Sequence, residues 1–138
     1  MQRILVCALI LLFAVDGAGQ QPQARKARRL CNGNAAVIGK CYRVHGRAFA
    51  TNGTPTLRIW QIGTDRILGV TGSRIADDAE DAIAPDNLLR ALNGYEHFVF
   101  GDFEVCPFTK EREGHMRTVC VERADNLVTE PSSYGSKD

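Results

Sequence analysis

GRAFATNGTPTLRIW, residues 46–60, holds two runs of alternating residue type on either side of Asn52-Gly53. An Asn-Gly pair tolerates positive φ at both positions and is typical of a two-residue type I′ turn between antiparallel strands. We therefore predict a hairpin whose strands span residues 41–50 and 56–63.

Basic and aromatic side chains collect on the face of this hairpin that points away from the predicted core. In the register set by the turn, Arg47 faces Arg58. The complete set is Arg43, His45, Arg47, Arg58 and Trp60. In small barrels that bind oligonucleotides or oligosaccharides, aromatic rings stack on the ligand and guanidinium groups hold anionic oxygens. We predict that this set binds a ligand. The alternative is that it only makes the exterior polar, with Trp60 covered by the helix, by another strand or by the arginine stems.

The chain after the hairpin predicts three more strands and one helix. A proline in the first turn and Asn93-Gly94 at the end delimit the helix. The expected strands span residues 66–71, 97–108 and 116–127, and the expected helix spans residues 85–92.

The aromatic residues of the fourth strand predict a bulge. Phe98 and Phe100 share one phase of the alternation, whereas Phe103 and Val105 share the other. Gly101 lies between the two pairs, and an extra residue in a strand shifts the alternation by one. We therefore predict a bulge at Gly101 that resets the alternation.

The order of three strands, a helix and two strands decides the predicted fold class, which is all-β with one short helix. The order matches the OB-fold, a small five-stranded barrel closed at one end by the helix between the third and fourth strands. A small β-sandwich or an open roll is the alternative. A chain of this length is enough for one core.

The first residues predict export. Arg3 precedes an unbroken apolar stretch at residues 4–15, and small residues follow it. These are the parts of a secretory signal peptide. The stretch is shorter than the about 20 residues that a membrane-spanning helix needs, although an uncleaved anchor remains the alternative. The predicted segments are a signal peptide at residues 1–17, a flexible basic arm at 18–29, the folded domain at 30–128 and a disordered tail at 129–138.

Four cysteines remain after the predicted signal peptide, and an even number in an exported chain predicts two disulfides. Cys106 and Cys120 lie symmetrically about the turn of the last hairpin, so we favour a bond between them and a second between Cys31 and Cys41. The alternative joins Cys41 to Cys106 and Cys31 to Cys120, because the first and fourth strands of an OB barrel are neighbours. A zinc site that includes His115 is a further alternative, although no C-x-x-C pair is present.

Glu104 and Glu122 oppose each other in the predicted register of the last hairpin. Two facing carboxylates repel unless a cation lies between them, so we predict an ion-pair cluster with Arg43 or Arg47. A carboxylate pair for hydrolysis is the alternative. No nucleophile elbow, phosphate-binding glycine loop, H-E-x-x-H or dinucleotide motif is present. We therefore assign no catalytic residue, metal or cofactor, and the sequence favours a non-enzymatic role.

Small exported bacterial proteins of uncharacterised function resemble this chain in two stretches. These are YRVHGRAFATNGTPTLRIWQIGTDRILGV (residues 42–70) and FGDFEVCPFTKEREGHMRTVCVERADNLV (residues 100–128). The resemblance implies a Gram-negative source and a periplasmic or cell-surface address. It assigns no catalytic role to any residue.

The sequence as a whole predicts a periplasmic or secreted binding module for an anionic or sugar-containing envelope ligand. The formal net charge is only +1, so the chain has no global attraction to polyanions and recognition depends on a local surface. The alternative is an interaction protein that docks another envelope protein, steered by acidic residues 77–81 and basic residues 25–29. The expected partners are an envelope polysaccharide, an anionic ligand or an envelope protein, with no stable membrane span.

Overall fold

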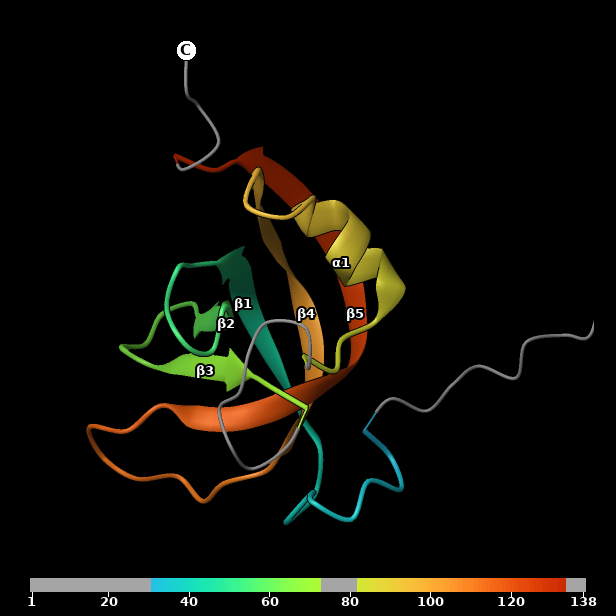
Figure 1. Cartoon of the computed structure of the whole chain (residues 1–138), viewed down its shortest axis with the longest axis vertical. Coiled ribbons are helices and arrows are strands. Elements are labelled where there is room, and N and C mark those ends of the chain that lie inside the picture. The colour runs from blue at the N-terminus through green and yellow to red at the C-terminus, as the bar shows by residue number, and fades with distance from the viewer. Residues whose placement is uncertain (1–30, 73–81, 134–138) are drawn as a thin grey trace, which may run out of the picture.

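The computed structural model describes residues 31–72 and 82–133. The described part holds five strands and one helix (Figure 1). They are β1 (Tyr42–Ala50), β2 (Leu57–Gln61), β3 (Ile67–Val70), α1 (Asp86–Leu92), β4 (His97–Pro107) and β5 (Arg117–Pro131). The predicted element types and their order are therefore confirmed. The predicted signal peptide, basic arm and acidic segment 77–81 lie outside the described residues.

The five strands form one sheet that closes on itself in the order β1-β2-β3-β5-β4. Parallel pairing joins β3 to β5, and the other neighbouring pairs are antiparallel. Figure 1 shows α1 lying against β4 and β5, and it also contacts β1. A closed ring leaves no unpaired strand edge, so each strand presents one face to the interior and one to the outside.

The interior of the ring is filled by the inward-facing half of each strand together with one side of the helix. Fully buried members include Ile59, Phe103 and Val119, and Leu88 of α1 reaches the same cluster. The helix is further tied to β5 by Asn87, whose Nδ2 donates to the carbonyl oxygen of Ala124 at 2.7 Å. This alternation of buried and outward residues is what gives the sheet a definite outer face.

Two glycines face each other where β1 crosses β4. A Cβ on Gly46 would lie 2.8 Å from the backbone oxygen of Trp60, and one on Gly101 would lie 2.8 Å from the backbone oxygen of Asp125. Backbone atoms cannot move aside as a flexible side chain can. Glycine is therefore needed at both positions because the neighbouring strands approach so closely.

The connection between β1 and β2 is longer than the predicted two-residue turn. Residues 51–56 form it: the Thr51 amide donates to the Thr56 carbonyl at 2.9 Å, and the Thr54–Pro55 peptide is cis. Arg47 consequently faces Trp60 rather than Arg58, so the predicted register is wrong by two residues. Because side chains alternate with a period of two, a shift of two keeps each of them on its predicted face.

The predicted reset of alternation at Gly101 is wrong. Buried and half-buried residues alternate through β4 from Val99 to Val105 without interruption. The register does shift beside Gly101, but the extra residue belongs to β5, where Asn126 adopts a left-handed φ of 54°. As a result, Phe98 and Phe100 point outward, in the same phase as each other and opposite to Phe103.

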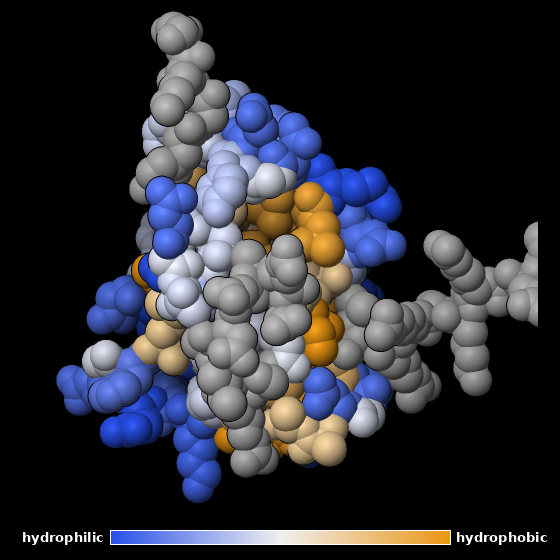
Figure 2. Space-filling view, in the orientation of Figure 1, coloured by the Kyte–Doolittle hydropathy of each residue, from blue (hydrophilic) through white to orange (hydrophobic). Residues whose placement is uncertain are grey.

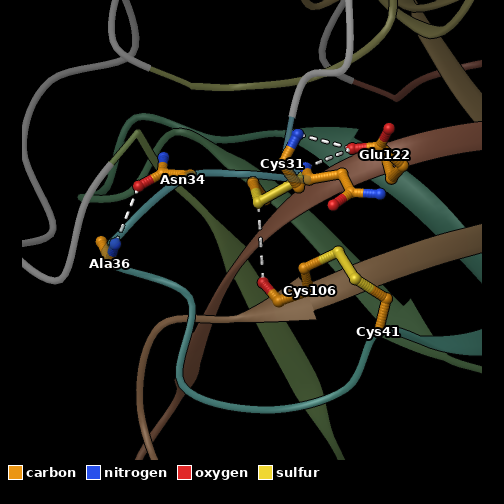
Figure 3. The surroundings of a disulfide bond; sticks show 8 residues. Cys31, Asn34, Ala36, Cys41, Cys106 and Glu122 are labelled. Carbon is orange, nitrogen blue, oxygen red and sulfur yellow. Dashed lines mark hydrogen bonds between the residues drawn. A yellow bond between two sulfur atoms is a disulfide. The ribbon is translucent and has the colours of Figure 1, made fainter.

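The favoured disulfide pairing is also wrong, and the alternative is the one observed. Cys31 bonds to Cys120 and Cys41 bonds to Cys106 (Figure 3). Cys106 and Cys120 do face each other, as the register predicted. Cys41 continues the register in which Tyr42 faces Val105, so it lies opposite Cys106, with the two Cα atoms 4.1 Å apart. Because Cys106 is bonded on the β1 side, Cys120 bonds to Cys31 in the segment before β1. Two disulfides are compatible with an oxidising, extracytoplasmic location.

The segment before β1 covers these cysteines. Cys31, Cys106, Cys120 and Phe108 form a second buried cluster, so Cys106 and Cys120 face away from the interior of the ring yet are buried. At the other terminus β5 continues to Pro131, three residues into the segment predicted to be a disordered tail. No helix within residues 31–72 and 82–133 is long and apolar enough to cross a membrane.

Candidate functional site

One row of residues crosses the outer face of all five strands. Each member is the direct register partner of the next, from β3 through β2, β1 and β4 to β5. The row is Ile67, Trp60, Arg47, Phe100 and Val128. Its two ends are exposed apolar residues, with Ile67 at 37% and Val128 at 60%. Rings and apolar groups thus form a continuous stripe around a central arginine.

A second row beside it adds two more rings. Phe49 faces Arg58, and Phe98 faces Glu130. We call the combined surface the aromatic half of the outer face; it comprises Phe49, Trp60, Phe98 and Phe100 with Arg47, Arg58, Ile67 and Val128.

The Arg47 guanidinium is held among three rings of the aromatic half. Its carbon lies 4.6 Å from the ring centroid of Phe98, 5.2 Å from that of Trp60 and 5.5 Å from that of Phe49. All three distances are within the range of a cation–π interaction. The buried Nε of Arg47 has no hydrogen-bond acceptor among residues 31–72 and 82–133. Aromatic faces therefore position this cation without neutralising it.

Trp60 is half-buried and is fixed in orientation. Its indole Nε1 donates to the carbonyl oxygen of Thr64 at 2.8 Å, and the Thr64 hydroxyl donates to the Gln61 carbonyl at 2.7 Å. The turn between β2 and β3 thus locks the ring. Arg47 lies over that ring, so the predicted alternative, in which an arginine covers Trp60, is partly observed.

Arg58 lies at the edge of the aromatic half, beside the β1–β2 loop. Its Nε donates to the carbonyl oxygen of Pro55 at 3.0 Å, and its guanidinium packs against Gly53. Within the part of the chain that the structure describes, Arg58 contacts no carboxylate. Its charge is therefore available to a ligand, although its position is fixed by the loop.

The remaining two predicted ligand-binding residues lie in a different environment on the same face. Arg43 contacts Asp125 at 3.5 Å, and His45 Nδ1 lies 3.0 Å from an oxygen of Asp102. Arg123 lies between the carboxylates of Asp125 at 3.3 Å and Glu104 at 3.6 Å. We call this surface the ion-pair half of the outer face; it comprises Arg43, His45, Asp102, Glu104, Arg123, Asp125 and Asn126.

Asp102 shows how the ion-pair half satisfies its own charges. The side-chain amide of Asn126 donates to one carboxylate oxygen at 2.8 Å, and His45 contacts the other. These contacts, with the Asn126 hydrogen bond the largest, hold the pKa of Asp102 below its ordinary value of 3.8. Exposed pairs of this kind contribute little to stability, but they leave these groups less free to hold an added anion.

The predicted facing pair of Glu104 and Glu122 is not formed. A second register shift makes Glu104 face Arg123, so Glu104 forms an ion pair with Arg123 rather than with Arg43 or Arg47, and Glu122 is not part of the cluster. Glu122 turns to the segment before β1, where its Oε2 accepts the backbone N–H groups of Cys31 and Asn32 (Figure 3). These two carboxylates therefore do not face each other as a pair for hydrolysis would require.

The four cysteines do not favour a metal site in the observed state. The sulfur atoms of Cys31, Cys106 and Cys120 lie within 4.8 Å of one another. All of them are in disulfides, whereas a metal needs thiolates. His115, the other expected ligand, lies outside this group, and its Nδ1 donates to the Glu113 carbonyl at 3.0 Å.

Sequence reasoning missed three of the four rings of the aromatic half. Phe49 continues the outward phase of Arg47 and would follow from simple alternation along β1. Phe98 and Phe100 were not predicted to belong to this surface, because the predicted bulge lay in β4 whereas the extra residue lies in β5. Unbroken alternation through Gly101 is the signal that would have placed them beside Arg47.

Comparisons with known proteins leave the site to be interpreted from its own chemistry. No protein-family model matches the chain, and neither the curated proteins nor the solved structures gave a significant match.

Proposed function

We propose that this protein is an exported, non-enzymatic binding module of the OB type that holds an anionic or sugar-containing envelope ligand on the aromatic half of its outer face. The order of elements, the helix between β3 and β4 and the five-stranded closed sheet support the OB assignment. Proteins with that architecture commonly bind ligands on the outer face of their strands.

The observation that carries the proposal is the unneutralised cation at the centre of this surface. In the ion-pair half, Arg43 and Arg123 contact carboxylates. In the aromatic half, neither Arg47 nor Arg58 contacts one within residues 31–72 and 82–133. Two cations without carboxylate partners, one of them held among three rings, can bind an anionic group attached to a flat or ring-shaped ligand.

The chemistry of binding follows from how Arg47 is held. Its rotamer is already restricted by three rings, so a ligand that pairs with it orders fewer side-chain torsions than with a free surface arginine. A charge-assisted hydrogen bond from a guanidinium to an anionic oxygen is worth about 1.5–3 kcal/mol. The exposed parts of the rings and the apolar ends of the row then supply stacking area.

A matched pair of arginine variants tests the proposal. Arg47→Met keeps an apolar stem among the rings and removes the charge, whereas Arg123→Met removes one equivalent charge from the ion-pair half. We expect the unmodified protein to be retained on immobilised lipopolysaccharide and released by salt. The Arg47 variant should lose this retention, and the Arg123 variant should elute with the unmodified protein.

Three outcomes contradict the proposal. Equal elution of Arg47→Met and the unmodified protein means that the cation is not used. Equal weakening by both variants means that only net charge matters. Retention on single-stranded DNA but not on lipopolysaccharide means that the ligand is not an envelope component. Circular dichroism of both variants provides the control for folding.

The exposed ends of the aromatic row favour a second candidate function, the docking of another envelope protein. Val128 and Ile67 expose apolar surface that a protein partner can cover. A photo-crosslinking residue at Val128, expressed in intact cells, should then give one recurrent protein adduct that is missing when the same residue replaces Arg123. Failure to recover a recurrent adduct at Val128 counts against this second function.

A further inference from the structure

A cleft opens at the end of the aromatic row. It has a volume of about 730 Å³ and lies between the turn that joins β2 to β3 and the loop that joins β4 to β5. Both connections project to the same side of the ring in Figure 1, and Figure 2 shows hydrophilic side chains gathered on that side. Ile67 belongs both to the aromatic row and to the wall of the cleft. The two surfaces are therefore continuous.

The charges that line the cleft balance. Its acidic residues are Asp65, Glu111 and Glu113, and its arginines are Arg66, Arg112 and Arg117. One ion pair, between Arg66 of the turn and Glu111 of the loop, joins the two walls. Equal numbers of opposite charges give the cleft no preference for a net anion or a net cation. This distinguishes it from the aromatic half, where the cations have no carboxylate partner.

Part of the cleft wall is a tyrosine held by an arginine. The guanidinium carbon of Arg117 lies 5.3 Å from the ring centroid of Tyr42, and its NH1 donates to the Tyr42 hydroxyl at 3.3 Å. The Nε of Arg117 also donates to the carbonyl oxygen of Thr109 at 2.9 Å. A half-buried ring and its hydroxyl are thus fixed in place before any ligand arrives.

Both hydrogen-bond donors and acceptors line the cleft at fixed positions. His115 donates from Nδ1 to the Glu113 carbonyl, so in its neutral form Nε2 is an acceptor. Arg112 supplies donors, and Gln61 supplies both donors and an acceptor. Ile67, Leu68 and Met116 place apolar groups between these polar ones. A sugar matches this combination, because each hydroxyl both donates and accepts while the ring presents apolar C–H groups.

We infer that the cleft is the subsite for uncharged sugar units of the ligand whose anionic group pairs with Arg47, so that the ligand is an acidic oligosaccharide lying across β1, β2 and β3. This inference rests on the proposed function. Neighbouring strands lie about 4.7–4.9 Å apart, which places Arg47 about 10 Å from Ile67 along the row. A chain of sugar units is long enough to span this distance, whereas free phosphate or a single acid group is not.

A glycan array followed by nuclear magnetic resonance tests the inference. The array identifies the acidic oligosaccharide that binds most tightly. That oligosaccharide is the acidic probe, and the same oligosaccharide without its acid group, the neutral remainder, is the second probe. We expect the acidic probe to bind at least about tenfold more tightly, as expected for one charge-assisted contact. It should shift backbone amide signals both near Arg47 and Trp60 and in residues 61–67 and 111–117, whereas the neutral remainder should shift only the latter two segments.

The two exposed ends of the row provide matched variants, because each lies two strands away from Arg47. Ile67→Gln should weaken both probes, and Val128→Gln should weaken neither. The cleft inference is overturned if the neutral remainder shifts no signal in residues 61–67 and 111–117, if both variants behave alike, or if no glycan binds while lipopolysaccharide retention still depends on Arg47. If instead the glycan binds the cleft and Arg47→Met binds it with full affinity, the proposed function fails and the sugar subsite stands.

Discussion

The two halves of the outer face are built on the same strands but treat charge in opposite ways. In the ion-pair half, Arg43 and Arg123 contact carboxylates and Asp102 receives a hydrogen bond from Asn126. In the aromatic half, Arg47 is surrounded by rings and its Nε has no acceptor among residues 31–72 and 82–133. One half pairs its charges internally, and the other holds a positioned cation that contacts no carboxylate of the described residues.

This difference shows that one outer face can place its cations in two environments, among carboxylates and among aromatic rings. Exposed ion pairs contribute about 0–1 kcal/mol each, so the ion-pair half adds little to stability. A buried donor without an acceptor costs about 1–3 kcal/mol, and cation–π contacts of about 0.5–1 kcal/mol each offset part of that cost. The contacts with the three rings therefore help to keep Arg47 in this position.

The largest effect is expected from removing the disulfide that lies next to the ion-pair half. The Cys41–Cys106 bond joins the residue before β1 to β4 across 65 residues of sequence, and closing such a loop stabilises by about 4 kcal/mol. Replacing both cysteines with alanine should lower the free energy of unfolding by that order in chemical denaturation. Hydrogen exchange should quicken more at Arg43 and Glu104 than at Arg47. Equal quickening in both halves would show that the disulfide does not stabilise one half more than the other. A loss below about 1 kcal/mol would show that the closed loop contributes little to stability.

A smaller effect is expected at the glycine that separates the two halves on β4. In Gly101→Ala, the new Cβ would meet the Asp125 backbone oxygen at 2.8 Å, and overpacking of this kind costs about 1–3 kcal/mol. Gly39→Ala is the control, because its Cβ would have an ordinary contact with Pro107 at 3.8 Å. Thermal unfolding should show a clear loss for the first variant and almost none for the second. Similar midpoints for the two would mean that the strands separate there easily.

The smallest effect is expected on the pKa of Asp102, the carboxylate that accepts a hydrogen bond from Asn126. Asn126→Gly permits the positive φ at this position but removes the amide, so the pKa of Asp102 should rise toward 3.8. Because the folded-state pKa is lowered, Asp102 adds stability at pH values above its ordinary pKa, and this is lost as the pH falls through the lowered pKa. Carboxyl signals followed by nuclear magnetic resonance report the pKa directly. An unchanged pKa in the variant would assign the shift to His45 instead.

The face of each residue on the hairpin was predictable from sequence, whereas its partner was not. Alternation along the strands placed Arg43, Arg47 and Trp60 on the outer face. Because side chains alternate between the two faces with a period of two, a register error of two residues leaves each of them on the same face. The turn length was mispredicted because Asn52-Gly53 sits inside a six-residue connection that contains a cis proline. Local turn signals do not reveal such a connection.

The disulfides and the full aromatic half depended on contacts between distant segments. Cys31 reaches Cys120 only because the segment before β1 lies over β5, which no spacing along the chain indicates. The two extra residues of β5, near Asn126 and at Glu122, also leave no clear signal in β4. The outward direction of Phe98 and Phe100 follows from unbroken alternation along β4, whereas the register that sets Phe100 opposite Arg47 emerged only from the arrangement of strands in space.

The fluorescence of Trp60 tests the central claim most directly, because Trp60 is the single tryptophan of the chain and touches the Arg47 guanidinium. The protein would be titrated with soluble lipopolysaccharide, and binding would be measured in parallel by calorimetry. We predict a saturable change in Trp60 emission that follows the calorimetric curve and disappears in Arg47→Met. Saturable binding by calorimetry with unchanged Trp60 emission would place the ligand elsewhere and contradict the account.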